Sequence, residues 1–333
     1  PVFAEFTGRP RGRLDAALEE RAQSVQPDDE SLLMYTSGST GKPKGVLQTH
    51  RSIITNIAIE TVYFGFDGDA RCLLHFPINH VAADVELGYG ALYSGGTLVL
   101  MDCFDANASL DIIPRERITH IGQVPTMYAM QAATGRFTET DWSSVRAFIW
   151  GGSAAPKRLL DLLEPIAQRK GARLITGYGS TELCGFVTYT FENEPRARLE
   201  LSVGKPVPPY EFKIVDEARN ALPCGETGEL AFRGPVLMKG YFNDPRATAA
   251  VIDAEGWFYT HDLGRFDEDG YLYLAGRCSE MFKSGGENVY PREIEDVLES
   301  HPAVLFAAVI GEKHEVFDEI GHAFVVLKPG RAE

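Results

Sequence analysis

The chain has 333 residues, of which 44% are hydrophobic and 24% are charged, as in an ordinary globular protein. Its formal net charge of −15 disfavours nucleic-acid backbones and anionic membrane surfaces as main partners. No stretch approaches the roughly 18 uninterrupted apolar residues of a transmembrane helix. The five cysteines stand singly, unlike a disulfide framework or a zinc site, so we expect a reducing, cytoplasmic setting.

Strands and helices are expected to alternate from Ser31 to Tyr178. The expected strands are Leu32–Thr36, Cys72–Phe76, Thr97–Met101, His120–Val124, Ala147–Trp150 and Arg173–Thr176. Helical patterns lie between some of them, at Ser52–Phe64, Pro125–Ala133 and Pro156–Lys170. This alternation predicts βαβ crossovers and a largely parallel sheet, in which ligands bind in the loops at the carboxyl ends of the strands.

The sequence changes character after about residue 200. Alternating runs at Glu211–Val215 and Glu229–Arg233, separated by Gly and Pro turns, predict a small antiparallel β subdomain. Beyond it we expect a helix and two strands, at Pro291–Ser300, Val304–Ile310 and His322–Leu327. The predicted fold class is therefore α/β, with residues 1–200 as the α/β part of a large domain, 201–276 as a small β-rich subdomain and 277–333 as the start of a small α+β C-terminal domain.

A loop rich in hydroxyls, glycines and lysines follows the first expected strand. Its glycines let the backbone approach a ligand closely, and its hydroxyls and lysines can surround phosphate oxygens. It is not a Walker A loop, because only two residues separate its first two glycines and a proline follows its first lysine. Its expected place between an apolar strand and an amphipathic helix argues against a flexible linker. The candidate phosphate-binding residues are Thr36, Ser37, Gly38, Ser39, Thr40, Gly41, Lys42 and Lys44.

Two more glycine-containing loops follow expected strands. Gly151–Pro156 opens a helix, although alone it could be a plain turn. Gly177–Glu182 is not a dinucleotide fingerprint, because a glutamate replaces the third glycine. The hydroxyl of Thr181 and the carboxylate of Glu182 suit a hard cation beside a triphosphate, although alone they could cap a surface helix. The remaining candidates in these loops are Gly152, Ser153, Ala154, Gly177, Tyr178 and Gly179.

Further along, the chain contains Tyr-Thr-His-Asp-Leu-Gly at Tyr259–Gly264 and a long polar run at Gly276–Pro291 that ends Ser-Gly-Gly-Glu-Asn-Val-Tyr-Pro. Together and in this order, the motifs resemble the adenylate-forming superfamily, over nearly the whole chain. That superfamily includes acyl-CoA synthetases, plant coumarate-CoA ligases, beetle luciferases and peptide-synthetase adenylation domains. The wording of Ser284–Pro291 is more typical of acyl-CoA synthetases than of peptide-synthetase domains.

The resemblance implies a role for each nucleotide motif. The loop at Thr36–Lys44 would hold the β- and γ-phosphates of ATP, and Gly151–Pro156 would line the adenine together with Tyr178. Thr181 would contact the α-phosphate, and Glu182 would help to hold Mg²⁺. Asp262 would accept hydrogen bonds from the ribose hydroxyls, which suits an acceptor-only carboxylate, and Arg277 would support the same ribose.

The resemblance also implies residues for the acyl and thiol steps. His80, which alone would more often be a core histidine, would lie near the substrate carboxylate and the thiol entry. Lys283 would act in the second half-reaction, on a moving loop that contains Gly285 and Gly286. Ser279 departs from the Asp or Lys that is usual at the family's hinge. The chain starts at Pro1 and stops at Glu333 before a Gly-Lys motif of the family, so we expect a fragment without the early N-terminal part or the catalytic lysine.

The implied activity is that of an ATP-dependent carboxylic acid–CoA ligase, with ATP/AMP, Mg²⁺ and coenzyme A as cofactors or co-substrates. Its partners would be a small carboxylic acid and CoA, and a homodimer is compatible with the sequence. An adenylation domain that loads a carrier protein stays open, because Asp84 lies near the usual aspartate of such domains. A non-catalytic nucleotide-binding relic is the third reading. The sequence does not identify the carboxylic acid substrate. The segments expected to form the acyl pocket are His80–Ala91, Phe148–Gly151 and Gly177–Gly185, and Trp150 would either limit the depth of this pocket or belong to the hydrophobic core.

Overall fold

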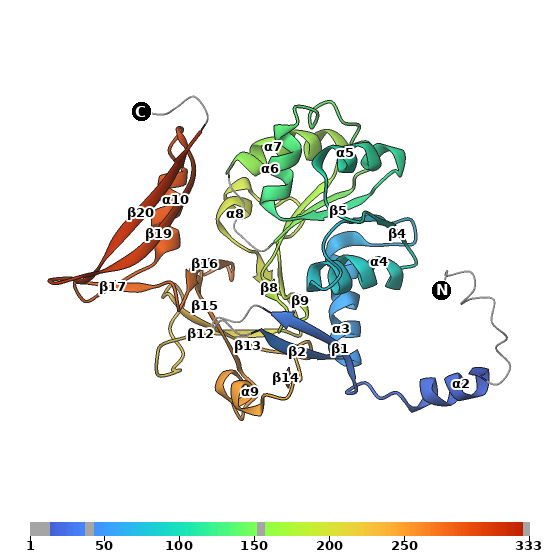
Figure 1. Cartoon of the computed structure of the whole chain (residues 1–333), viewed down its shortest axis with the longest axis horizontal. Coiled ribbons are helices and arrows are strands. Elements are labelled where there is room, and N and C mark those ends of the chain that lie inside the picture. The colour runs from blue at the N-terminus through green and yellow to red at the C-terminus, as the bar shows by residue number, and fades with distance from the viewer. Residues whose placement is uncertain (1–13, 37–42, 152–156, 329–333) are drawn as a thin grey trace.

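A five-stranded parallel sheet organises the first half of the chain (Figure 1). The structure is a computed structural model, and it describes residues 14–36, 43–151 and 157–328. In spatial order the strands are β4 (Thr97–Leu100), β3 (Arg71–Leu74), β5 (His120–Gln123), β6 (Ala147–Trp150) and β7 (Arg173–Thr176). All four strand pairs are parallel, so the predicted α/β fold class is confirmed.

Helices cover both faces of this sheet, because successive side chains of its buried strands point to opposite sides. On β6, Ile149 belongs to one hydrophobic core, while Phe148 and Trp150 belong to a second one. The first core includes residues of α3 (His50–Glu60), the π-helical turns η1 (Thr61–Gly65) and η2 (Ala82–Tyr89), and α4 (Gly90–Tyr93). The second includes residues of α5 (Ala106–Arg115), α6 (Pro125–Ala133), α7 (Lys157–Lys170) and α8 (Arg196–Leu201).

The first strand of the described chain does not join the parallel sheet. β1 (Glu30–Thr36) pairs antiparallel with β2 (Lys44–Thr49), which also pairs with β14 (Gly240–Tyr241). The prediction that Leu32–Thr36 belongs to the parallel sheet is therefore wrong. So is the prediction that its loop leads into a helix, because α3 begins only after β2, with the Thr49 side chain accepting from the Ser52 amide. The short connection between β1 and β2 permits a hairpin, whereas parallel neighbours need a longer crossover.

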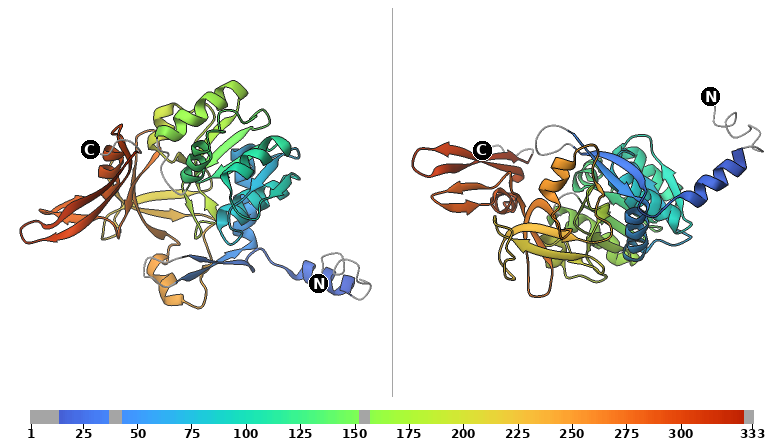
Figure 2. Two further views of the ribbon diagram at one scale, coloured as in Figure 1. Left: turned by 45° about the horizontal axis from the view of Figure 1, so that its top comes forward. Right: turned by 90° about the horizontal axis from the view of Figure 1, so that it is seen from below.

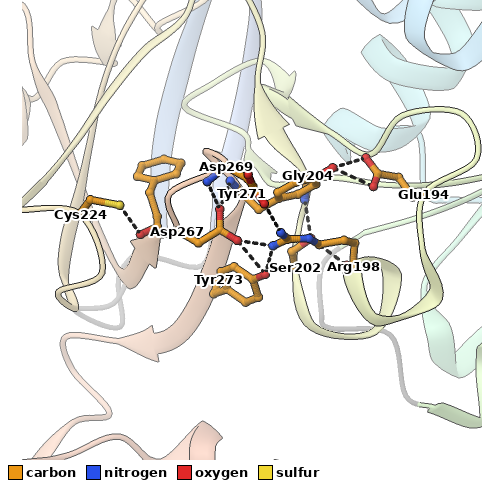
Figure 3. Close-up of polar contacts among 10 residues, drawn as sticks. Glu194, Arg198, Ser202, Gly204, Cys224, Asp267, Asp269, Tyr271 and Tyr273 are labelled. Atoms are coloured by element: carbon orange, nitrogen blue, oxygen red, sulfur yellow. Dashed lines mark hydrogen bonds and ion pairs between the residues drawn. The ribbon is translucent and has the colours of Figure 1, made fainter.

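A second, antiparallel sheet follows in the order β12 (Glu211–Val215), β13 (Gly228–Arg233), β15 (Phe258–Phe266) and β16 (Leu272–Arg277). Figure 3 shows the polar contacts between Arg198 of α8 and residues of the turn between β15 and β16. The guanidinium of Arg198 pairs with Asp267 and Asp269, and its Cζ lies 4.0 Å from the ring centroid of Tyr271. The hydroxyl of Tyr271 in turn contacts both carboxylate oxygens of Glu194, at 2.9 and 2.8 Å. These contacts hold the antiparallel sheet against the α/β part.

The C-terminal strands form a sheet of their own. It contains β18 (Glu287–Val289), β17 (Phe282–Ser284), β20 (Asp318–Leu327) and β19 (Val304–His314), with α10 (Pro291–Glu299) packed on β19. β19 and β20 extend beyond the predicted strands because they continue as a long hairpin. Figures 1 and 2 place this sheet at one end of the molecule and α2 (Leu14–Ser24) at the other.

Short elements complete the fold: β8 (Gly179–Ser180) with β9 (Gly185–Phe186), β10 (Thr188–Tyr189) with β11 (Lys205–Pro206), and α9 (Pro245–Val251). No helix in the described parts of the chain is long and apolar enough to cross a membrane. The division of the chain into domains at residues 200 and 276 stays a prediction. One sheet combines strands that are distant in sequence, because β14 pairs with β2.

Candidate active site

A cavity of about 690 Å³ lies at the carboxyl ends of β5 and β6. Strands of the β1–β2–β14 sheet and of the β12–β13–β15–β16 sheet also contribute to its lining. Each of the three segments expected to form the pocket contributes to its wall, through His80–Ala82, Ile149–Gly151 and Gly179–Glu182 among others. Residues of the β1–β2 hairpin and of strands β15 and β16 also line the cavity. The predicted site residues that line it are Thr36, Lys44, His80, Gly179, Thr181, Glu182, Asp262 and Arg277.

Both carboxylate oxygens of Asp262 are held in place at this wall. The hydroxyl of Tyr178 donates to Oδ2 at 2.6 Å, and Nε of Arg277 lies 3.2 Å from Oδ1. Asp262 and Arg277 are register partners on β15 and β16, so the sheet itself brings them together. Burial raises the pKa of Asp262, while the Tyr178 donor and the Arg277 charge lower it. The result is a carboxylate whose orientation is fixed before any ligand arrives.

The loop that carries Thr181 and Glu182 is fixed by three contacts from distant segments. The buried side chain of Gln48 on β2 donates to the Thr181 carbonyl at 2.7 Å. The amide of Met238 donates to the Glu182 carbonyl at 2.8 Å, and the hydroxyl of Tyr241 donates to Oε1 of Glu182 at 3.1 Å. These contacts hold the Glu182 carboxylate at the cavity, where its oxygen chemistry suits Mg²⁺.

Among the described residues of this acidic chain, Lys44 and Arg277 are the Lys and Arg side chains that line the cavity. Lys44 places its Nζ 4.9 Å from the ring centroid of Tyr241, the same residue that orients Glu182. Arg277 approaches from the other side, beside Asp262. Both therefore lie where they can attract the negative charge of a nucleotide phosphate, despite the net charge of −15.

His80 lies at the rim of the cavity, with its ring stacked near that of Phe76 at a centroid distance of 6.3 Å. Its Nδ1 accepts from the Ala82 amide at 3.1 Å. Desolvation lowers the pKa of His80 below its ordinary value. The imidazole is therefore neutral near pH 7.

The structure places other predicted residues outside the cavity lining. Gly177 packs under Thr188, whose carbonyl oxygen would lie 2.2 Å from an added Cβ, and Tyr178 reaches the site only through Asp262. Lys283 lies on β17 with its Nζ 3.5 Å from Oε1 of Glu217, and Gly285 and Gly286 form the turn that follows. Ser37, Gly38, Ser39, Thr40, Gly41 and Lys42, and also Gly152, Ser153 and Ala154, lie outside the described residues.

Sequence reasoning missed three side chains of this site: Gln48, Tyr241 and Glu86. Glu86, one of two acids in the mostly apolar run at His80–Ala91, lines the cavity while only 7% exposed, and its place in that run was the available signal. Trp150, by contrast, is 1% exposed and packs in the second hydrophobic core, although it also contributes to the cavity wall.

A second group of side chains, which does not include Glu182, could hold a transition metal. Among the described residues, the His, Cys and acidic side chains that gather closely enough to hold a metal are Glu229, His261 and Cys278, whose ligand atoms lie within 4.8 Å of one another. Its sulfur and nitrogen atoms do not suit Mg²⁺, which prefers oxygen ligands. Glu182 therefore remains the residue that fits this ion.

Comparison with known proteins decides the family. Residues 4–242 match the family model described as AMP-binding enzyme, and residues 293–333 match the model of the AMP-binding enzyme C-terminal domain. The chain belongs to the AMP-binding enzyme family. The resemblance to adenylate-forming enzymes is thereby confirmed.

Relatives of this AMP-binding enzyme include CoA ligases. Feruloyl-CoA synthase of Amycolatopsis sp is 38% identical over 96% of this chain and 64% of its own length. Indoleacetate–CoA ligase of Aromatoleum aromaticum is 37% identical over 99% of this chain and 65% of its own length. The chain thus spans somewhat less than two thirds of these relatives.

Solved structures show the same fold. ATP-bound MatB from Rhodopseudomonas palustris has a TM-score of 0.83 and 31% identity, over 92% of this chain and 59% of that chain. The o-succinylbenzoate CoA synthetase of Bacillus subtilis, in complex with its acyl-adenylate intermediate, has a TM-score of 0.78 and 36% identity, over 91% of this chain and 60% of that chain.

Proposed function

We propose that this chain carries the nucleotide and acyl sites of an ATP-dependent carboxylic acid–CoA ligase. The observation that supports it best is the pair of carboxylates, Asp262 and Glu182, held on one cavity by Tyr178 and Tyr241. Asp262 would accept from the ribose hydroxyls, and Glu182 would bind Mg²⁺ at the phosphates. The names of the relatives, which are CoA synthases and ligases, agree with this assignment.

The chemistry would proceed in two steps. A substrate carboxylate oxygen attacks the α-phosphorus of ATP and displaces pyrophosphate, which gives an acyl-adenylate. The thiol sulfur of CoA then attacks the acyl carbon, AMP leaves with the former carboxylate oxygen, and the thiol proton is released. Because both partners of the first step are anions, the site must supply positive charge and donors, which Lys44 and Arg277 provide here. Bound Mg²⁺ would supply further charge at the phosphates.

CoA is the acceptor that we favour over a carrier protein. An amino-acid adenylation domain would need a carboxylate in the pocket to pair with the substrate ammonium. Asp84, the candidate for that role, is not among the residues that line the cavity, and its pKa is raised by burial and lowered by a hydrogen bond from Tyr89. The wording of Ser284–Pro291 also supports CoA.

The acceptor can be tested with the purified protein, ATP, Mg²⁺, a panel of short, long and aryl acids, and either CoA or a phosphopantetheinylated carrier protein. We expect an acyl-CoA, detected by mass spectrometry. Acylation of the carrier protein alone would overturn the choice of acceptor. Binding of ATP without release of pyrophosphate for any acid would favour a non-catalytic relic.

A further inference from the structure

Two buried carboxyl groups lie side by side at the inner wall of the cavity. Glu60, at the end of α3, is 0% exposed, and Glu86, on η2, is 7% exposed. Both approach Gly185 on β9: a Cβ added there would lie 2.8 Å from Oε1 of Glu60 and 3.0 Å from Cγ of Glu86. Glu86 lines the cavity and Glu60 does not, so Glu60 backs Glu86 from within the protein.

Among the described residues, the surroundings of this pair offer hydrogen bonds but no cation. Oε1 of Glu60 accepts from Asn56 at 2.9 Å and from the Phe186 amide at 3.2 Å, and the hydroxyl of Tyr210 fixes Asn56 at 2.8 Å. Oε2 of Glu60 has no partner among the described residues. The interactions that set the pKa values of Glu60 and Glu86 include no Lys or Arg of the described chain.

Two ionised carboxylates in such a place would repel each other strongly. Burial raises the pKa of Glu86 to about 8, and burial together with the charge of Glu86 raises the pKa of Glu60. Near pH 7 the pair therefore retains at least one proton. Unlike an ionised carboxylate, a protonated carboxyl can donate a hydrogen bond as well as accept one.

Several aromatic and aliphatic side chains line the same cavity as Glu86. Phe64, Leu87, Ile149 and Phe186 line it, and the ring of Phe186 lies so close to Gly151 that an added Cβ would be 2.5 Å from Cζ. Aromatic and aliphatic walls suit a flat hydrocarbon body. A substrate that is apolar throughout would leave the Glu86 carboxyl desolvated and unpaired, which is costly. A substrate with a second carboxylate would bring another anion against the acidic pair.

We propose that Glu86, backed by Glu60, hydrogen-bonds an uncharged hydroxyl at the far end of the acyl group and so selects hydroxyaryl carboxylic acids. This inference rests on the proposed function, because it uses the same cavity for the acyl group. Glu86 acts as a specificity-determining residue, and Glu60 acts through it, because ionisation of Glu86 would place a negative charge beside a second buried carboxyl group.

The test uses hydrolysis-resistant sulfamoyl analogues of four acyl-adenylates, made from 4-hydroxycinnamate, cinnamate, 4-carboxycinnamate and 4-(aminomethyl)cinnamate, in calorimetric titrations near neutral pH. The hydroxy analogue should bind roughly 10-fold more tightly than the unsubstituted one, as expected for one buried hydrogen bond, and the carboxy analogue should bind most weakly. Equal affinity for the first two overturns the inference. Tightest binding of a 4-aminomethyl analogue also overturns it in favour of an ammonium group. No binding of any analogue contradicts the proposed function itself.

Variants place the effect on Glu86. Glu86→Leu, of similar size, should remove the preference for the hydroxyl and tighten binding of the cinnamate analogue, and loss of one buried acid beside another need not destabilise the fold. Asp84→Asn, on the same helix but away from the cavity lining, should keep the wild-type ratio. Melting curves identify a variant that fails to fold, and the wild-type ratio then still decides the question. A Glu86→Leu protein that keeps the hydroxyl preference contradicts the assignment.

Discussion

The hydroxyl of Tyr178 donates to Oδ2 of Asp262 at 2.6 Å and so joins the loop after β7 to strand β15 of the antiparallel sheet. Arg277 holds the other carboxylate oxygen, at 3.2 Å. Because both oxygens are positioned by the protein, a ribose entering the cavity meets an acceptor that needs no rearrangement. The proposed nucleotide site thus depends on contacts between parts of the fold that are far apart in sequence.

We expect Asp262→Asn to weaken ATP binding by roughly 10- to 100-fold, since hydrogen bonds to a charged acceptor are lost. The amide keeps the shape of the side chain and one acceptor for Tyr178, so the fold should survive. Calorimetric titration with ATP and Mg²⁺ measures the change. Asp69→Asn, in an exposed turn before β3, is the matched control and should bind as the wild type does. Unchanged affinity in Asp262→Asn would refute the assignment to ribose.

Tyr241→Phe should weaken the response to Mg²⁺ and leave the cation–π contact intact. The ring remains beside Lys44, but the hydrogen bond to Oε1 of Glu182 is lost. A less well oriented Glu182 should raise the Mg²⁺ concentration needed for half-maximal ATP binding, by up to about 10-fold. Tyr271→Phe loses a similar bond, to Glu194, far from the cavity lining, and should leave the Mg²⁺ response unchanged. Equal effects of the two substitutions would argue against a role of Glu182 in metal binding.

The stability of the protein should fall as the pH rises through the range in which Glu86 titrates. Its pKa is raised from 4.5 to about 8 in the folded chain, mainly by burial. Between these values the folded chain holds a proton that the unfolded chain has released, so the free energy of unfolding decreases with rising pH and levels off above about pH 8.

Glu86→Gln should flatten this decline, because the amide does not titrate. Urea unfolding at several pH values across the window measures it. A residual slope from Glu60, whose pKa is also raised, should remain. Glu268→Gln, in an exposed turn, is the control and should follow the wild-type curve. A Glu86→Gln curve parallel to the wild type would show that Glu86 is ionised in the folded chain at neutral pH.

A substitution at Lys283 tests whether the C-terminal unit rotates during the reaction. In this arrangement its Nζ lies beside Glu217 and outside the cavity lining, so a role in catalysis requires the unit to rotate. We expect Lys283→Ala to slow thioester formation from a preformed acyl-adenylate and CoA by more than roughly 10-fold, with adenylate formation unaffected. Lys313→Ala, exposed on β19, is the control. Equal loss in both half-reactions would contradict a role confined to the second.

The sequence was sufficient to place the strands of the parallel sheet. Short β-rich runs that are followed by a glycine predicted Ala147–Trp150 and Arg173–Thr176 with the boundaries that the structure shows. The partner of Leu32–Thr36 was not predictable in the same way. Its pairing with β2 is antiparallel, and the third strand of that sheet, β14, pairs with β2 from almost 200 residues away along the chain, so local pattern does not reveal it.

Site residues that stand in sequence motifs were predictable, whereas the residues that orient them through contacts between distant segments were missed. Thr181, Glu182, Asp262 and Arg277 stand in recognisable motifs and do line one cavity. The residues that orient them do not stand in such motifs. Gln48 acts on Thr181 across 133 residues, and Tyr241 acts on Glu182 across 59. By local pattern alone both read as ordinary strand residues.

The most direct test of the proposed reaction follows one oxygen atom. A carboxylic acid labelled with heavy oxygen in its carboxylate is incubated with the protein, ATP, Mg²⁺ and CoA, and AMP and pyrophosphate are analysed by mass spectrometry. Adenylation predicts that one labelled oxygen appears in AMP and none in pyrophosphate, because the carboxylate attacks the α-phosphorus and the thiol then attacks the acyl carbon. Formation of ADP with label in inorganic phosphate, or thioester formation with unlabelled AMP, would contradict the account.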